Sequence, residues 1–463
     1  MLFSSLVFIF RFMPLFFLCY FLTPKSYRNV TLFLGSIIFY AVGEPVYVFL
    51  MLTVIVANFV LCVHMARGRG QRGGKRIVAF AMVLDFGLLF VFKYFDFFAG
   101  NLNFLFRKDV IPLLHLTLPL GISFYTFQIA SYVIDVYRGK IKYTGSLLEF
   151  ASYVSMFPQL IAGPIVQYPE VSKELRKRKV TLLDIERGLE IFCLGLGSKV
   201  LLANKIYTLW NQVQGIGFAN LSTPMAWLGA FAYSFHIYFD FWGYSLMAIG
   251  LGRMMGFRIP QNFDSPYMVK SATQFWRKWH MTLGRFFREY VYIPLGGNRK
   301  GRGRMILNTF IVWALTGLWH GADWNFVVWG LTFFVLLMLE KFIYGKYLER
   351  SKVIGHIYIW ILIPVTWVIF AVTDFPQLLI YLKQLVGIHT GEVLVKNVQL
   401  SRYLEQYAAL LLACAFFSTK LPHRIYRRIR GGLVIVAFAV AVFWFSVYEL
   451  ANGANNPFLY FRF

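Results

Sequence analysis

Apolar residues fill most of this chain in runs of helical length, and short connections rich in Lys and Arg separate the runs. A helix needs about 20 mostly apolar residues to cross the hydrocarbon core of a bilayer. The pattern therefore predicts an all-α, polytopic membrane fold with about 11–12 transmembrane helices. The expected spans lie near residues 3–22, 29–43, 45–65, 77–99, 117–137, 188–208, 225–252, 306–322, 326–345, 354–374, 404–419 and 432–450.

The composition supports a membrane protein and excludes an ordinary soluble enzyme. Of the 463 residues, 58% are hydrophobic and only 14% are charged, whereas a soluble domain carries about 25% charged residues. Lys and Arg number 46 against 21 Asp and Glu, a formal net charge of +25. In so apolar a chain, this excess indicates the positive-inside rule and contact with anionic headgroups; nucleic-acid binding is not expected.

The basic residues gather in a few connections between the predicted spans. These connections are 23–28, 67–76, 138–142, 173–179, 253–305, 341–352 and 420–430. Because basic loops remain in the cytosol, the pattern predicts a multi-pass protein of the inner, cytoplasmic membrane. Both termini, including the C-terminal NNPFLYFRF, are then expected outside the cytosol.

Two segments depart from a simple alternation of spans and loops. Residues 147–167 are apolar enough to cross, but their flanks are both basic, and Pro158, Gly163 and Pro164 interrupt the run. A re-entrant hairpin satisfies both features, since irregular backbone is tolerated at membrane depth where protein or water covers it. Residues 262–305 combine many cations with many aromatic side chains, which predicts an amphipathic, half-inserted cytosolic segment.

Polar residues inside the apolar zone are candidates for function, because lipid makes their burial costly. His236 and Asp240 lie four residues apart and therefore share a helix face, although a purely structural polar pair is an alternative. Asp323 and Asn325 follow a predicted span and are candidates for orienting a nearby histidine ring. These four residues are the candidate polar lining of the protein interior.

Two histidines are the candidate catalytic residues. His320 lies about 14 residues into the span that begins near Ile306, so roughly 21 Å deep at about 1.5 Å per residue. Gly317 and Gly321 flank this histidine and predict room for a narrow substrate beside its ring. His280 lies in the cationic, aromatic segment. A lone buried histidine favours a packing role, but the flanking glycines and the second histidine favour chemistry.

The same cationic segment predicts a cytosolic site for a phosphorylated ligand that carries a ring. Its candidate cations are Arg277, Lys278 and Arg299, which suit pairing with phosphates. Its candidate aromatic residues are Trp276 and Trp279, which suit stacking on adenine. An interfacial anchor explains the same composition. No set of Cys and His residues has metal-ligand spacing, so neither a metal site nor a permanently bound cofactor is expected.

The chain resembles the membrane-bound O-acyltransferase family at FWRKWH (275–280) and GLWHG (317–321). The likeness is greatest to the bacterial branch that contains the alginate and peptidoglycan O-acetylation membrane components. Further matching segments, in the same order, are LPLGISFYTFQIASYVIDVYRG, FPQLIAGPIVQY and YFDFWGYSLMAIGLGRMMGF. The resemblance covers nearly the whole chain, and it implies a single domain, 1–463, in which helices form a funnel around a central tunnel.

The resemblance also implies roles for individual residues. The family's two motif histidines correspond to His320 and His280. The predicted spans place His280 nearer the cytosolic entrance, so His320 is expected at the centre of the chemistry and His280 is expected to position the thioester or assist the departing thiol. The implied acyl donor is cytosolic acetyl-CoA, and the implied partner is an extracytoplasmic SGNH-type esterase-like protein. Branch members carry Ser and Asp where this chain has Trp242 and Leu246, so the roles of those positions do not transfer, whereas Asp240 is retained.

The leading hypothesis is therefore an O-acyltransferase that moves an acetyl group across the membrane. The acceptor is expected to be an extracytoplasmic polysaccharide, either cell-wall peptidoglycan or an exopolysaccharide such as alginate. A D-alanyl transferase for teichoic acid is the alternative enzyme. A transporter of polysaccharide or lipid carrier without acyl chemistry is the alternative class, but no inverted repeat or chain of carboxylates supports it.

Overall fold

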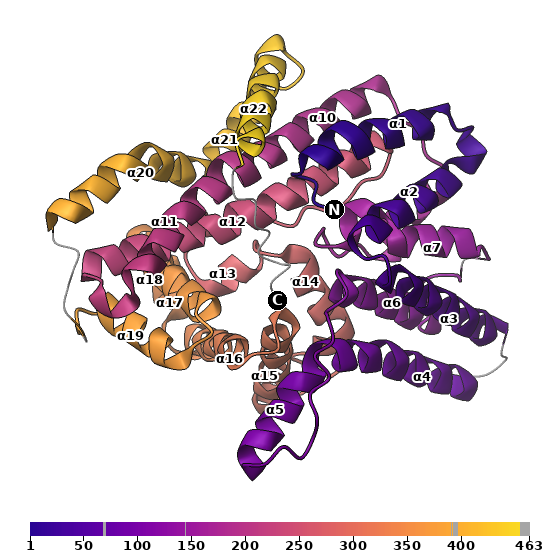
Figure 1. Ribbon diagram of the computed structural model, residues 1–463. Coiled ribbons are helices and arrows are strands. Elements are labelled where there is room, and N and C mark those ends of the chain that lie inside the picture. Colours follow the sequence, from indigo (N-terminus) through magenta and orange to yellow (C-terminus); the bar gives the residue numbers. More distant parts are fainter. Residues whose placement is uncertain (68–70, 144, 390, 392–396, 454–463) are drawn as a thin grey trace. The chain divides into compact units, whose positions relative to one another are not determined.

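The computed structural model describes residues 1–67, 71–143, 145–389, 391 and 397–453, and these residues form helices and turns without a strand (Figure 1). The chain separates into two compact units. The first comprises Met1–Phe192 and Met247–Pro260, and the second comprises Cys193–Leu246 and Gln261–Phe463. The expectation of a single domain over 1–463 stays a prediction.

The first unit contains most of the N-terminal helices, among which η marks a π- or 3-10 helix. They are η1 (Phe8–Phe12), α1 (Met13–Leu22), η2 (Lys25–Tyr27), α2 (Arg28–Gly43), α3 (Tyr47–Arg67), α4 (Gln71–Leu89), η3 (Phe90–Tyr94), α5 (Phe95–Phe106), α6 (Ile122–Tyr137), α7 (Leu147–Ser155), α8 (Phe157–Leu160), α9 (Tyr168–Arg176) and the start of α10 (Leu182–Gly197). Helices α3, α4, α6 and α7 pack side by side (Figure 1).

The second unit begins at the end of α10 and contains the remaining helices, except for the last turns of α12. They are η4 (Ser198–Ala203), α11 (Asn204–Ile216), η5 (Phe218–Asn220), α12 (Thr223–Met254), η6 (Pro266–Met268), α13 (Ala272–Trp276), α14 (Met281–Phe287), η7 (Arg288–Tyr292), α15 (Gly301–His320), α16 (Trp324–Leu339), η8 (Glu340–Tyr344), α17 (Gly345–Arg350), α18 (Lys352–Ala371), α19 (Phe375–Leu385), α20 (Asn397–Phe417), α21 (Leu421–Ile429) and α22 (Leu433–Ala451).

Among the described residues, five helical stretches are long and apolar enough to cross a membrane. They are Tyr47–Arg67, Gly73–Phe106, Trp324–Arg350, Val353–Ala371 and Leu433–Ala451. All five overlap predicted spans, and the all-α membrane fold is confirmed. Helix α12 coincides with the predicted span 225–252, and most of its side chains are buried. A helix buried all round can carry polar groups that lipid would not accept.

The run at 147–167 is broken, as its prolines and glycine predicted. It forms the nine-residue helix α7 and the four-residue helix α8, and the chain then turns towards α9. The Tyr153 hydroxyl donates to the Val166 carbonyl at 2.9 Å, and the Gln159 amide donates to the Tyr153 carbonyl at 2.7 Å. These buried bonds hold the returning chain against α7. The re-entrant hairpin itself stays a prediction.

The segment 262–305 is a series of short helices and turns, and most of its aromatic side chains are buried. Phe275, Trp279 and Phe286 are each 3% exposed or less. We expected an amphipathic segment whose tryptophans stack on a ligand ring or lie at the headgroups. The rings instead bury against other aromatic side chains of the second unit, because a protein core covers more of their surface than a bilayer boundary does.

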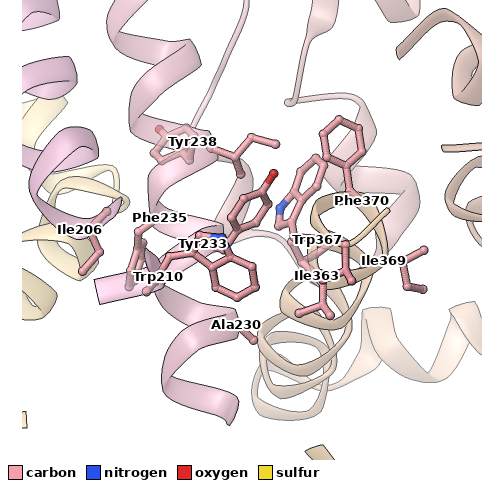
Figure 2. Close-up of a cluster of buried hydrophobic side chains, with 14 of the residues drawn as sticks. Ile206, Trp210, Ala230, Tyr233, Phe235, Tyr238, Ile363, Trp367, Ile369 and Phe370 are labelled. Atoms are coloured by element: carbon pink, nitrogen blue, oxygen red, sulfur yellow. The ribbon is translucent and has the colours of Figure 1, made fainter. Parts of the chain in front are cut away.

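Aromatic side chains also form the core of the second unit. Figure 2 shows Trp210 beside Tyr233, and Trp367 beside Phe370. Their ring centroids lie 5.1 Å and 5.5 Å apart, respectively. Such pairs contribute about 0.5–1.5 kcal/mol each beyond the burial of their area. The rings come from α11, α12 and α18, so the core ties together helices that are distant in the sequence.

The C-terminal NNPFLYFRF lies outside the described residues, as do residues 68–70 of the basic connection 67–76. The expected extracytoplasmic position of the C-terminus therefore stays a prediction.

Candidate active site

His320 is the last residue of α15, which packs against α16 as an antiparallel hairpin. The two backbones come very close. A Cβ on Gly330 would lie 2.5 Å from the Trp313 carbonyl oxygen and 3.1 Å from the Gly317 Cα. His320 is 4% exposed. The close hairpin therefore fixes the position from which the buried imidazole projects.

Three aromatic rings surround the His320 imidazole. The ring centroids of Trp319 and Trp329 both lie 5.0 Å from it, and that of Phe370 lies 5.3 Å away. All three contacts are edge-to-face. Close packing against rigid rings leaves the imidazole few alternative rotamers. The site thus holds a histidine in fixed, largely apolar surroundings.

The expectation of free space beside Gly317 and Gly321 is wrong. A Cβ on Gly321 would collide with the ring of Phe326, and a Cβ on Gly317 would collide with the Phe326 carbonyl oxygen. Both glycines therefore allow α15 and α16 to pack closely. They determine the direction of His320 through the hairpin, and they do not provide room for an acyl chain.

Asp323 and Asn325 act on the backbone around His320. Asp323 caps α16 by accepting a hydrogen bond from the Trp324 N–H at 2.7 Å. Asn325 is fully buried, and its amide donates to the Phe370 carbonyl at 2.8 Å. We expected one of them to orient the imidazole directly. The structure gives an indirect arrangement, since Asn325 holds the backbone of Phe370 and the ring of Phe370 contacts His320.

His280 lies just before α14 in a left-handed backbone conformation, with φ of 44°. Its Nδ1 atom is 3.2 Å from Oδ1 of Asn262, and its ring is 4.7 Å from that of Phe241. The side chain is 1% exposed, and this burial lowers the pKa of His280 to about 3. The imidazole is therefore neutral at physiological pH. Uncommon backbone conformations of this kind cluster at functional sites.

A single indole joins the two candidate catalytic residues. The centroid of Trp319 lies 5.6 Å from that of His280 and 5.0 Å from that of His320. The chain thereby brings His280, which precedes α14, and His320, at the end of α15, to the same aromatic side chain. Sequence spacing could not reveal this arrangement, because it depends on the packing of α14 against the end of α15.

Trp276 and Trp279 pack inside the second unit. Trp279 is 1% exposed, and its ring centroid lies 4.8 Å from that of Trp367. The ring of Trp276 lies 4.8 Å from those of Trp313 and Phe333. The two tryptophans contact protein rings where we expected a ligand ring. They anchor the segment that carries Arg277 and His280, and any effect they have on a donor is indirect.

The cations of the candidate donor site differ in their surroundings. Arg277 and Arg299 are exposed. Lys278 donates to the Asp264 carboxylate at 2.8 Å, and this bond holds the pKa of Asp264 below its usual value. Arg277 and Arg299 are thus available to phosphates, whereas Lys278 already shares its charge with a carboxylate.

A buried ion pair connects α12 with η4. Lys199 Nζ lies 2.5 Å from Asp240 Oδ1, with both side chains 1% exposed, and it also donates to the Asn204 oxygen at 2.8 Å. Gly243 allows the two helices to approach this closely, since a Cβ there would lie 2.9 Å from the backbone nitrogen of Lys199. Sequence reasoning missed Lys199. The sequence did indicate such a pair, because a cation within the predicted span 188–208 requires an anionic partner.

His236 lies one turn before Asp240 on α12, as the spacing predicted, but its own contacts are different. Its Nδ1 atom is 3.1 Å from the Ala203 carbonyl oxygen, and its ring lies 4.4 Å from that of Tyr207. His236 and Asp240 thus both tie α12 to η4 and the start of α11. These contacts favour the structural alternative for the pair.

The chain is similar to one protein family and to several bacterial enzymes. The MBOAT, membrane-bound O-acyltransferase family matches residues 140–372, which include His280 and His320. The chain is 39% identical over 375 residues to the "Probable alginate O-acetylase AlgI" of Pseudomonas aeruginosa, covering 80% of this chain and 72% of that protein. It is 33% identical over 520 aligned positions to the "Peptidoglycan O-acetyltransferase" of Helicobacter pylori, covering 100% and 98%. A "Teichoic acid D-alanyltransferase" of Bacillus subtilis is 27% identical over 244 residues, covering 50% and 61%.

The buried ion pair generates a test of stability. Lys199→Met and Asp240→Leu should each destabilise the folded protein by about 3–5 kcal/mol, because each leaves an uncompensated buried charge. The double variant should be closer to wild type than either single variant, since it removes both charges. The free energy of unfolding in detergent, measured for the wild type, the two single variants and the double variant, completes a double-mutant cycle. Additive losses in the double variant would contradict the pairing.

Proposed function

Since this chain belongs to the MBOAT, membrane-bound O-acyltransferase family, we propose that it moves an acetyl group from cytosolic acetyl-CoA across the membrane to an extracytoplasmic polysaccharide. It is a membrane enzyme that transfers acyl groups to oxygen. The relatives from Pseudomonas aeruginosa and Helicobacter pylori, at 39% and 33% identity, are named for O-acetylation of alginate and of peptidoglycan. The D-alanyl relative matches only half of this chain, so an acetyl donor is favoured over D-alanine.

The observation that supports this proposal is that the rings of His280 and His320 both contact the indole of Trp319. In the transfer, the acceptor oxygen forms a bond to the thioester carbonyl carbon, the carbon–sulfur bond breaks, and the hydroxyl proton ends on the departing thiol. An imidazole assists either as a general base or as a nucleophile that carries the acetyl group. We assign this role to His320, and we place His280 at the donor side, against the thioester arm.

The donor's phosphates are proposed to lie against Arg277 and Arg299, with Lys278 as a third cation. Phosphate pairing with exposed guanidinium groups is strong and bidentate. Trp276 and Trp279 hold this segment in the aromatic core and so keep Arg277 at a constant position relative to His280. No cofactor is required, because acetyl-CoA enters as a substrate.

We propose that the basic segments 173–179 and 298–304 face the cytosol and that both termini lie outside it. The distribution of basic residues supports this orientation. Donor entry then occurs at the side that carries Arg299, and acetyl release occurs at the opposite side. An extracytoplasmic SGNH-type esterase-like protein is the proposed partner that completes the transfer to the polysaccharide.

The proposed chemistry predicts a large effect at His320. His320→Ala should lower polysaccharide acetylation per folded protein by about 10²–10⁴-fold, because general-base assistance is lost. His280→Ala should lower it by about tenfold or more. Acetyl transfer by purified protein with acetyl-CoA measures both variants, and His64→Ala, at an exposed histidine of the first unit, is the control. Retention of more than roughly a tenth of wild-type turnover by His320→Ala would place the chemistry elsewhere.

The donor site predicts an effect on affinity that is separate from chemistry. A variant with Arg277→Gln, Lys278→Gln and Arg299→Gln should raise KM for acetyl-CoA about tenfold or more, with kcat little changed, because two or three phosphate contacts are lost. Its KM should also depend less on salt. Lys383→Gln, at an exposed cation on α19, is the matched control. An unchanged KM in the triple variant would contradict the assignment.

The orientation predicts which residues an impermeant thiol reagent reaches on intact cells. In a background without the four native cysteines, Lys108→Cys should be labelled directly, whereas Lys177→Cys should be labelled only after permeabilisation. Both positions are exposed in the structure, so access depends on the side of the membrane. Direct labelling of Lys177→Cys would mean that the run at 147–167 crosses the membrane.

A further inference from the structure

The imidazole of His280 is held by one buried side chain, Asn262. The amide oxygen of Asn262 lies 3.2 Å from His280 Nδ1, and it accepts from the Thr282 hydroxyl at 2.9 Å and from the Thr282 N–H at 3.2 Å. The backbone carbonyl of Asn262 accepts from the Met281 N–H at 3.0 Å. Asn262 thus binds the two residues that follow the left-handed position, Met281 and Thr282, and the His280 ring itself.

These hydrogen bonds determine which ring nitrogen carries the hydrogen. A backbone N–H only donates, so the Asn262 atom that faces Thr282 and His280 is the oxygen. An oxygen that accepts requires a donor on the ring, so Nδ1 of His280 carries its hydrogen. In a neutral imidazole, Nε2 then has a lone pair and no hydrogen. The orientation of a single amide therefore fixes the tautomer.

The other ends of the same two side chains are buried and have no hydrogen-bond partner within the described part of the chain. They are Nε2 of His280, an acceptor, and Nδ2 of Asn262, a donor. Buried polar atoms of this kind are usually satisfied by a ligand or by water. Phe241 lies edge-on to the His280 ring at 4.7 Å and restricts its rotation, so Nε2 has a fixed direction.

We infer, on the basis of the proposed function, that Asn262 is a positioning residue that holds His280 as the Nδ1–H tautomer, so that Nε2 receives an O–H or N–H group of a substrate. The substrate group is a hydrogen-bond donor, namely the acceptor hydroxyl or an amide of the acyl donor's arm. A thioester oxygen and a departing thiolate are both acceptors, and this tautomer does not donate to them. His280 therefore orients a substrate or accepts a proton, and it does not protonate the thiol.

Kinetics of Asn262 variants test the positioning role. Asn262→Ala should lower kcat about tenfold or more, with KM for acetyl-CoA within about twofold, because the ring loses its fixed tautomer and direction. Asn262→Asp should restore most of kcat, since a carboxylate oxygen accepts the same hydrogen bonds. The matched control is Asn308→Ala, because Asn308 is also fully buried and its amide donates to the Gly297 carbonyl at 2.9 Å. Its kcat per folded protein should stay near that of wild type.

A kcat for Asn262→Ala equal to that of wild type would overturn the inference. A folded Asn262→Asp variant that is no more active than Asn262→Ala would also overturn the inference. An oxygen at position 262 that accepts a hydrogen bond from His280 would then not affect kcat. Wild-type protein without any acetyl transfer, but with the expected tautomer, would contradict the proposed function and leave the tautomer assignment supported.

Nitrogen-15 NMR of histidine-labelled protein reads the tautomer without any assay of activity. The His280 signals are those lost in His280→Gln. The wild-type and Asn262→Asp proteins should show a protonated Nδ1 and an unprotonated Nε2, and Asn262→Ala should show a mixture. A protonated Nε2 in the wild-type protein would overturn the inference even if Asn262→Ala failed to fold.

Discussion

Polar groups that are buried away from water must find partners inside the protein, and this requirement governs both units. In the first unit, the amide of Asn58 donates to the carboxylate of Asp85 at 2.7 Å, and so joins α3 to α4. In the second unit, Lys199 and Asp240 neutralise each other between η4 and α12. Apolar packing alone leaves helices free to slide, whereas such pairs are satisfied in one register only.

The two candidate catalytic histidines meet this requirement in different ways. His280 is held by a hydrogen bond to Asn262, and His320 is enclosed by the edges of aromatic rings. The first arrangement selects one tautomer of a neutral ring. The second restricts the rotation of the ring. Two histidines that both contact the indole of Trp319 can thus serve different steps of a single acyl transfer.

The aromatic core gives this arrangement its rigidity. Trp279, Trp329 and Trp367 are almost completely buried, and the rings of Trp329 and Trp367 stack at 5.8 Å. The same core contacts His320 through Phe370 and anchors the segment that carries Arg277. A donor bound at the cations and an imidazole at the site of transfer would thereby share one rigid support. Catalysis benefits from such pre-organisation, because reacting groups need no rearrangement during the step.

The amino-acid sequence alone determined the helical membrane fold and the break in the run at 147–167, and it singled out His280 and His320 as candidates. These features depend on local properties, namely hydrophobic runs, prolines and glycines, and motif residues that are adjacent in the chain. Only the tertiary structure decided that Phe326 fills the space beside Gly317, and that Asn262 and Trp319 contact His280.

The partner of Asp240 was also decided by tertiary structure. The sequence placed His236 on its helix face, but Lys199 came from a neighbouring helix. Likewise, Trp279 looked suited to a ligand ring by its neighbours in sequence, and it packs against Trp367. In each case the contact depends on which helices pack together and on how far each helix is shifted along its axis. Residue spacing carries no information on that choice, because the partners lie in different helices and many packings satisfy the same hydrophobic pattern.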